Sequence, residues 1–472
     1  MISPSPSLFP DAAERKRIDD LLTVQLAEAA ARLRIGPVKP LFDAKRSAAE
    51  LAAFDFSSPR KIDECLAFAI RELEGGIVHK THPRYFGLFN PAPTFPSECA
   101  DRIVGAFNPQ LAAATTSPAA VAIEAHVIAA VGKRAGLGEG VHGHFTSGGS
   151  EANFTALICA LTRKEPRFAA EGARAFAGAP VFYVSADCHL AWIKIAHAAG
   201  IGRNAVRIVA TDGRGEMDIA ALRKAIADDR SSGNVPVMVV ATAGTTNAGM
   251  IDPLEACAEV ARAQNAWYHI DAAWGGGAIA SDRLRPLLTG IEQADSVTID
   301  AHKWFATTMG CGMFLTRQGG VLPEAFQVNN SFMPSQLPSR DPYMTSMQWS
   351  RRFLGLRLFL SLAAAGWPGF GEHVERAVKN AAALSGEMTS RGWTVANASH
   401  LAVVCLEPPP GSADVAIIAD RVVRSGRAWV SSGRFEGRTV LRACITHGET
   451  SPEDVMALVR ALEQYDGAAG RD

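Results

Sequence analysis

Residues 296–317 read SVTIDAHKWFATTMGCGMFLTR, and this stretch decides how the chain folds. The apolar runs SVTID and GMFLTR at its two ends are typical of buried strands. Lys303 lies shortly after the first run. A lysine at the end of a buried strand is costly to bury unless it is paired or covalently modified, and Schiff-base chemistry would supply a reason. The alternative is a solvated surface charge, which is the commoner role of a single lysine.

Further apolar runs of this kind alternate with helical stretches from about residue 80 to about residue 320. They lie at 181–185, 206–210, 235–242, 266–273, 296–300 and 312–317. Strands that alternate with helices are typical of a mainly parallel sheet covered by helices, so we predict an α/β fold. We assign residues 79–355 to this large domain.

Both flanks of the large domain have a different pattern. Residues 12–34 and 58–76 carry apolar side chains at helical spacing, which predicts a helical N-terminal segment at 1–78. Its apolar stripes need a surface to cover, either on a partner subunit or on their own chain. Residues 356–472 combine an apolar helix with short strand-like runs, which predicts a small C-terminal α+β domain.

The composition is that of a soluble globular enzyme, because 48% of the 472 residues are hydrophobic, 20% are charged and the net charge is -1. This balance offers no basic field for nucleic acid. The eight cysteines lie far apart without a CxxC pair, which favours reduced thiols and gives no sign of a metal site. No signal peptide or membrane-spanning apolar run is evident, so we expect a cytoplasmic protein with no membrane partner.

Asp271 ends an apolar run within HIDAAW, where a carboxylate should not be buried without a cationic partner. A protonated pyridine nitrogen is such a partner, and holding that nitrogen protonated makes a pyridine cofactor an electron sink. The alternative is an aspartate that caps a turn.

Three other segments place polar groups after predicted strands or before helices. TSGGSEAN at 146–153 could cradle a phosphate with glycine amides and a helix N-terminus, although it could also be a simple cap and turn. His189 could stack on an aromatic cofactor, although a single histidine is more often structural. Thr245 and Thr246 offer hydroxyls in a loop near the same sheet edge. Open α/β sheets bind ligands at such strand ends.

Taken in order, HPRYFG, TSGGSEANF, the His189 loop, ATAGTT, HIDAAW and DAHKW resemble the group II pyridoxal-phosphate-dependent decarboxylases. That family includes decarboxylases of aromatic amino acids, histidine, glutamate, cysteine sulfinate and 2,4-diaminobutyrate. The resemblance extends from His82 to about Thr450. It implies an aspartate-aminotransferase-like fold (fold type I), pyridoxal 5'-phosphate as cofactor, an amino acid substrate, and a homodimer whose N-terminal helices lie across the partner.

The resemblance also implies roles for individual residues. Lys303 would form the Schiff base with the cofactor, Asp271 would pair with its pyridine nitrogen, and His189 would stack on its ring. The other positions that match cofactor-binding stretches are Ser147, Gly148, Thr246, Ala273, Asp300 and His302. Arg442, in TVLRACIT, matches an arginine near the family's active site.

The stretch THPRYFGLFNPAPTFP corresponds to the region that shapes the family's side-chain pocket. It supplies Tyr85, Phe86, Leu88 and Phe89. Family members that act on glutamate or cysteine sulfinate usually have an Asn-Gln pair where this chain has Gly87 and Leu88. An apolar pocket favours an aromatic or other nonpolar substrate, because a substrate carboxylate would lack a partner there. The alternative is that these aromatic residues belong to the core.

The expected reaction is decarboxylation of an L-amino acid to the amine and CO2. The same cofactor would also serve an aminotransferase, a carbon–carbon lyase or a non-catalytic regulatory module, but the order of the motifs favours decarboxylation over these.

One position departs from the family pattern. A loop before residues 351–353 carries, in many of these decarboxylases, a tyrosine that donates a proton to the reaction intermediate, and its best match here is Phe332. A phenyl ring has no proton to give, and related aldehyde synthases with phenylalanine there couple decarboxylation to oxidative deamination by dioxygen. Release of an aldehyde is therefore the alternative to release of the amine. Tyr343, His189 or a water could also donate the proton.

Overall fold

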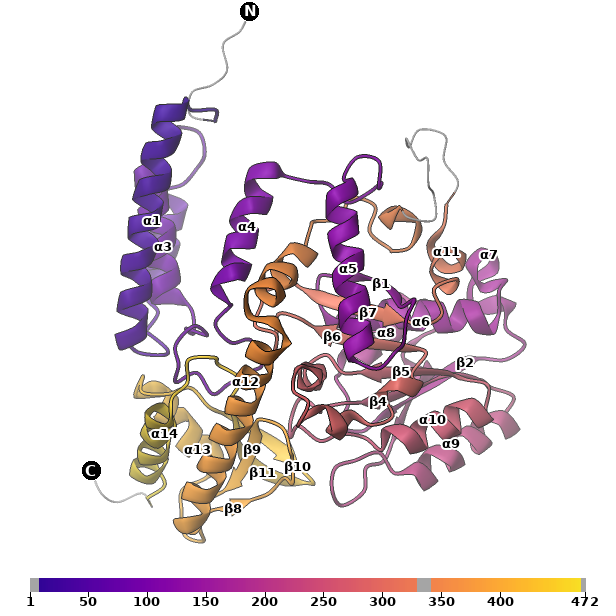
Figure 1. Ribbon diagram of the computed structural model, residues 1–472. Helices are drawn as coiled ribbons and strands as arrows, with labels where there is room; N and C mark the ends of the chain where they lie inside the picture. The colour runs from indigo at the N-terminus through magenta and orange to yellow at the C-terminus, as the bar shows by residue number, and fades with distance from the viewer. Residues whose placement is uncertain (1–7, 329–340, 468–472) are drawn as a thin grey trace, which may run out of the picture.

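A seven-stranded sheet lies at the centre of the protein, whose computed structural model describes residues 8–328 and 341–467 (Figure 1). The strands are β1 (His142–Thr146), β2 (Pro180–Ser185), β3 (Val206–Val209), β4 (Val235–Thr242), β5 (Trp267–Asp271), β6 (Ser296–Asp300) and β7 (Gly312–Thr316). Their order is β1-β7-β6-β5-β4-β2-β3. The strands from β3 to β6 are parallel neighbours, whereas β7 is antiparallel to both β6 and β1. The predicted mainly parallel α/β sheet is therefore confirmed.

Helices cover both faces of this sheet because successive strand residues point to opposite sides. On one face Phe182 and Val240 pack against α6 (Gly149–Lys164) and α8 (Ala191–Ala198). On the other face Tyr183 and Val239 belong to the core that includes α5 (Pro118–Arg134), α9 (Ile219–Ser231) and α10 (Leu254–Ala263). Both faces are apolar, as expected for strands in a parallel sheet.

The parallel register brings the carboxyl ends of neighbouring strands to one edge of the sheet. Thr242 at the end of β4 pairs with Asp271 at the end of β5, and Asp271 pairs with Thr298 near the end of β6. The loops that carry the polar sequence motifs therefore open at the same edge.

A long helix, α12 (Gly355–Ser390), connects this sheet to the C-terminal part of the chain (Figure 1). Gly366 has a positive φ of 61°, and the helix is kinked there, two residues before Pro368. The C-terminal sheet is antiparallel, in the order β10-β11-β9-β8. Its elements are β8 (Thr394–Val395), β9 (Val403–Glu407), α13 (Val415–Arg424), β10 (Ser431–Phe435), β11 (Arg438–Cys444) and α14 (Pro452–Tyr465).

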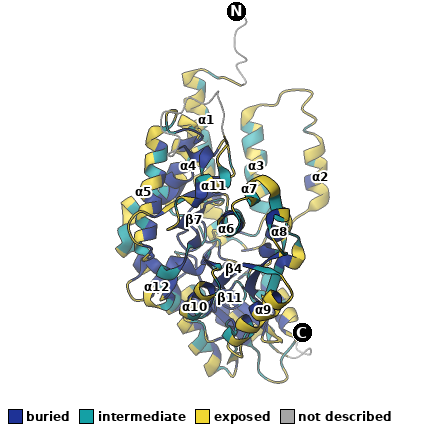
Figure 2. Ribbon diagram, turned by 90° about the vertical axis from the view of Figure 1, so that its right-hand side faces the viewer, coloured by how far each residue is buried: buried dark blue, intermediate teal, exposed yellow. Residues whose placement is uncertain are grey.

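Most residues of the N-terminal helices are exposed or only partly buried (Figure 2). They are α1 (Ala12–Ile35), α2 (Ala44–Ala52) and α3 (Ile62–Gly76), followed by α4 (Phe95–Phe107). Ion pairs join α1 to α3 at Arg17–Asp63 and Arg32–Glu74, both at 2.8 Å. In these two helices only Ala29 is buried.

The remaining elements are short. They are α7 (Phe168–Glu171), α11 (Val321–Phe326) and 3-10 helices at Gly172–Ala175, Arg203–Ala205, Gly275–Ala280, Arg285–Leu288, Ile291–Gln293 and Pro342–Met344. Within residues 8–328 and 341–467, no helix has both the length and the apolar character needed to span a bilayer.

Candidate active site

A cavity of about 350 Å³ opens at the edge of the large sheet where the parallel strands end. Its wall is built from the start of α6 and from the residues that follow β2, β4, β5 and β6. The residues predicted to bind a cofactor all line it, namely Ser147, Gly148, His189, Thr246, Asp271, Ala273, Asp300, His302 and Lys303. The structure thus brings together side chains from five separate segments of sequence.

Lys303 reaches this cavity from a turn at the end of β6. Asp300 closes the strand by donating its backbone N–H to Ala273 O (2.9 Å), and Lys303 N–H donates to Asp300 O (3.1 Å). The Lys303 ammonium lies 3.0 Å from Asp300 Oδ2, and the Asp300 side chain is only 2% exposed. The buried carboxylate therefore supplies the counter-charge that a lysine needs at this depth.

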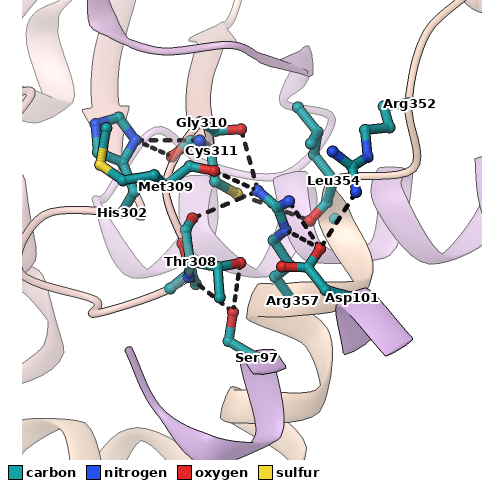
Figure 3. A network of polar contacts seen from close by, with 12 residues as sticks. Ser97, Asp101, His302, Thr308, Met309, Gly310, Cys311, Arg352, Leu354 and Arg357 are labelled. Atoms are coloured by element: carbon teal, nitrogen blue, oxygen red, sulfur yellow. Dashed lines mark hydrogen bonds and ion pairs between the residues drawn. The ribbon is translucent and has the colours of Figure 1, made fainter. Parts of the chain in front are cut away.

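A buried arginine holds the turn that follows Lys303 (Figure 3). Arg357, at the start of α12, donates through Nη1 to the carbonyl oxygens of Thr308 (3.4 Å), Met309 (2.9 Å) and Gly310 (3.2 Å). Its Nε donates to Asp101 Oδ1 on α4 at 2.8 Å. Three consecutive carbonyls thus share one guanidinium, which fixes the path of the backbone between β6 and β7.

His302 is held by the next residue of that turn (Figure 3). The backbone N–H of Cys311 donates to His302 Nδ1 at 3.1 Å. The same Nδ1 lies 3.0 Å from Cys311 O, so both backbone groups of Cys311 contact it, and Nε2 lies 3.8 Å from Asp300 Oδ2. Burial lowers the pKa of His302, which favours a neutral ring.

Asp271 is held by a chain of buried hydrogen bonds that the sequence did not reveal. Trp267 Nε1–H donates to Ser296 Oγ (2.8 Å), and that hydroxyl lies 2.8 Å from His269 Nδ1. His269 Nε2 lies 3.1 Å from Asn153 Oδ1, and Asn153 Nδ2 donates to Asp271 Oδ2 at 2.8 Å.

These bonds fix the direction of the whole chain. The Asn153 amide nitrogen faces a carboxylate, so its oxygen must accept from His269 Nε2–H, and the Ser296 hydroxyl must donate to His269 Nδ1. Burial lowers the pKa of His269 to about 4, which keeps the ring neutral as this pattern requires. Asp271 is therefore buried as an acceptor, and among the described residues no cation lies within ion-pair distance of it.

The start of α6 forms a cradle opposite Lys303. A Cβ at Gly149 would lie 2.9 Å from Asp300 Oδ2 and 3.3 Å from Ala273 Cβ, so only glycine allows this close approach. In the present structure Ser147 donates both its N–H and its hydroxyl to Glu151 Oε2, each at 2.7 Å. An anion at this helix N-terminus would compete with the Glu151 carboxylate for the same donors.

His189 is exposed at the mouth of the cavity. The backbone N–H of Ala191 donates to His189 Nδ1 at 3.1 Å, so a neutral ring carries its proton on Nε2. That N–H is available to a ligand in the cavity.

The aromatic residues predicted to shape a substrate pocket lie behind the cavity wall. Phe86 has no exposed surface and belongs to the core, while Leu88 is exposed. Tyr85 is buried and accepts from Leu88 N–H at 3.0 Å. Phe89 stacks on Trp274, which lines the cavity, with ring centroids 4.3 Å apart.

Arg442 lies next to this stack, its guanidinium carbon 5.0 Å from the centre of the Phe89 ring. It donates through Nη1 to Gly87 O (2.8 Å) and through Nε to Thr246 O (3.0 Å). Nη2 is buried and has no partner among the described residues.

Phe332, the match to the family's proton-donating tyrosine, lies outside the described residues. Tyr343, considered as an alternative proton donor, does not line the cavity. Tyr343 is buried and stacks on Trp349, with ring centroids 4.8 Å apart.

The site fits a phosphorylated pyridine aldehyde. It offers a lysine amine, a buried carboxylate without a cation, and a glycine cradle at the start of a helix. Asp300 Oδ1, also buried, has no hydrogen-bond partner among the described residues. The lysine amine could bind the aldehyde of such a cofactor, the buried carboxylate could pair with its ring nitrogen, and the glycine cradle could hold its phosphate.

Comparisons with known proteins agree with this chemistry. The family described as the pyridoxal-dependent decarboxylase conserved domain matches residues 52–407. The chain is 30% identical over 391 residues to an L-2,4-diaminobutyrate decarboxylase of Rhizobium meliloti (strain 1021), covering 81% of this chain and 77% of the relative. It is 30% identical over 410 residues to the acidic amino acid decarboxylase GADL1 of Bos taurus (82% and 78%). It is 26% identical over 414 residues to an aromatic-L-amino-acid decarboxylase of Bacillus atrophaeus (85% and 84%).

Among solved structures, the chain is similar to the crystal structure of mouse CSAD, with a TM-score of 0.91 and 25% identity. The match covers 97% of this chain and 99% of that chain. The predicted fold type I architecture is confirmed by this similarity.

We predict that Arg357→Met loosens the turn after Lys303. Loss of a charged hydrogen bond costs roughly 1.5–3 kcal/mol, so amide hydrogen exchange in peptides that cover residues 302–312 should accelerate by about tenfold or more. Arg352→Met is the matched control, because Arg352 approaches the same Asp101 only at 3.8 Å from a largely exposed position. Unchanged exchange in Arg357→Met would show that the turn is held by other contacts.

Proposed function

Since the chain belongs to the pyridoxal-dependent decarboxylase family and is a pyridoxal-phosphate-dependent amino acid decarboxylase, we propose that its substrate has an aromatic or other nonpolar side chain. The products are the corresponding amine and CO2. The observation that carries this proposal is the cavity wall, whose basic residues are all assigned to the cofactor and whose Trp274 is backed by Phe89.

The cofactor supplies an electron-poor ring that takes up the electron pair of the broken bond between Cα and the carboxylate. We assign Lys303 as the amine that holds it and Asp271 as the carboxylate that keeps a proton on its ring nitrogen. Asp271 can do so because Asn153 orients one oxygen and Ala273 N–H the other, at 2.8 Å and 3.2 Å. His189, with its proton on Nε2, lies where it can cover the ring and donate to the substrate carboxylate. Gly148, Ser147 and Thr246 are assigned to the phosphate side.

The charges around the cavity favour a nonpolar substrate over an acidic one. The basic residues that line it, within the described part of the chain, are His189, His302 and Lys303, and all three are assigned to the cofactor. Arg84 is already paired with Asp454 at 3.0 Å. An acidic side chain would therefore have to rely on Arg442, which is not among the residues that line the cavity and whose one unpartnered nitrogen, Nη2, is buried.

Phe332 supports a second candidate function. Without a tyrosine hydroxyl at that position, dioxygen can replace the proton as the acceptor of electrons, and the products become an aldehyde, CO2, ammonia and hydrogen peroxide. We retain simple decarboxylation as the first proposal because His189 Nε2–H offers another proton source in the cavity.

We further propose that the protein is a homodimer. The N-terminal helices and their connections present large apolar side chains to solvent, including Ile35 (88% exposed) and Phe56 (92% exposed). An apolar surface of this kind on helices with almost no buried residues is typical of an interface.

The substrate proposal predicts a higher kcat/KM for aromatic amino acids than for glutamate, aspartate or 2,4-diaminobutyrate, by about tenfold or more. The measurement is release of labelled CO2 with each amino acid, with identification of every product. Lys303→Ala is the control and should release none. A preference for an acidic or a diamino substrate would contradict the nonpolar pocket and direct attention to Arg442.

For the choice between amine and aldehyde, we expect the wild-type protein to form one amine per CO2 without consuming oxygen. Oxygen uptake and peroxide should be measured in the wild type and in Phe332→Tyr. Peroxide that forms in the wild type and disappears in Phe332→Tyr would replace the first proposal with the second.

For the dimer, we expect sedimentation velocity to give twice the mass of the 50.1 kDa chain. Glutamate at both Ile35 and Phe56 should weaken association by about tenfold or more, because two charges would then have to be buried. Ile417→Glu on α13 is the control, since it changes an exposed residue of the C-terminal part. Equal association of both variants would place the interface elsewhere.

A further inference from the structure

The carboxylate of Asp300 lies directly under the first turn of α6. A Cβ at Gly149 would lie 2.9 Å from Asp300 Oδ2 and 3.4 Å from Oδ1. Both oxygens therefore face the helix N-terminus, which is where backbone N–H groups favour an anion. An acidic side chain at this place is unexpected, because it repels the phosphate that the cradle would otherwise attract.

One of the two oxygens lacks a donor. Oδ2 contacts the Lys303 ammonium at 3.0 Å, whereas Oδ1 has no hydrogen-bond partner among the described residues. The neighbouring Thr146 hydroxyl donates to Gly148 O at 3.0 Å, so its proton is already used. A buried acceptor without a donor is costly, and a ligand that brings a proton would remove that cost.

The groups around Asp300 leave few sources for that proton. The turn supplies Lys303 and His302, whose burial favours the neutral ring, while Cys311, just before β7, is a buried thiol. Of the other titratable groups on the cavity wall, Asp271 and Glu151 are acids, and His189 is an exposed imidazole at the cavity mouth. Lys303 is thus the one ammonium facing Asp300 in the described structure, and it contacts Oδ2 and not Oδ1.

We propose that the cradle binds the cofactor phosphate together with one proton, shared between Asp300 Oδ1 and a phosphate oxygen. Two acids in contact cannot both be fully ionised, and they share a proton instead. The second pKa of a phosphate monoester is about 6, so this proton must be taken up from solvent when binding occurs above that pH. The inference rests on the proposed placement of the phosphate at the start of α6.

Pyridoxamine 5'-phosphate is the probe, because it carries the phosphate but no aldehyde and so cannot react with Lys303. Its Kd for the cofactor-free protein should be measured calorimetrically from about pH 7 to about pH 9, above the phosphate pKa. Uptake of one proton makes Kd rise about tenfold per pH unit. The pH slope of Kd for the wild type should therefore exceed the slope for Asp300→Asn by this amount. The Asn amide can donate to the phosphate without taking up a proton from solvent. Equal slopes overturn the proposal.

Two further comparisons keep the test independent of that variant. On the wild type, the slope for pyridoxamine 5'-phosphate should exceed the slope for pyridoxamine by about one proton, and equal slopes again overturn the proposal. Gly149→Ala should weaken binding of pyridoxamine 5'-phosphate more than that of pyridoxamine, because its Cβ would enter the cradle. Equal weakening would instead refute the placement of the phosphate at the start of α6. Equal pH slopes would refute only the shared proton, so the two outcomes can be told apart.

Discussion

The ion pair between Lys303 and Asp300 is the contact on which the site depends. A lysine at the end of a buried strand can stay charged only beside a counter-charge, and Asp300 supplies it from the last position of β6. This requires glycine at 149, where α6 begins against the carboxylate. It also requires a turn that returns the chain to β7, and Arg357 holds that turn through its carbonyls. The Lys303–Asp300 pair thus constrains both the residue at the start of α6 and the connection from β6 to β7.

The sequence predicted the strands from β2 to β7 because each is a short apolar run between polar or glycine-rich segments. It missed β1, since HGHFT is only five residues long and contains a glycine and two histidines. It placed the start of the second helix near Ser58, whereas α3 begins at Ile62. No side-chain hydrogen bond caps α3 at Lys61, and the apolar period alone does not define the first residue of a helix.

The sequence predicted the residues assigned to the cofactor better than it predicted the residues that hold them in place or those near the substrate. Groups at the ends of parallel strands must meet at one edge, so Asp271 and Lys303 could be brought together from sequence order. Asn153 and His269 could not, because a polar residue inside an apolar run shows neither its partner nor its direction. Phe86 illustrates the remaining difficulty, since an aromatic residue beside a pocket and one inside the core look alike in sequence.

The directed chain from Trp267 to Asp271 has an evolutionary consequence. Its three inner members, Ser296, His269 and Asn153, each donate at one end and accept at the other, so replacing His269 or Asn153 alone leaves a buried group unpaired, at a cost of roughly 1–3 kcal/mol. Such changes are tolerated only when a neighbour changes in a compensating way. These positions should therefore be inherited as a linked set and covary among descendants, whatever substrate a descendant comes to use.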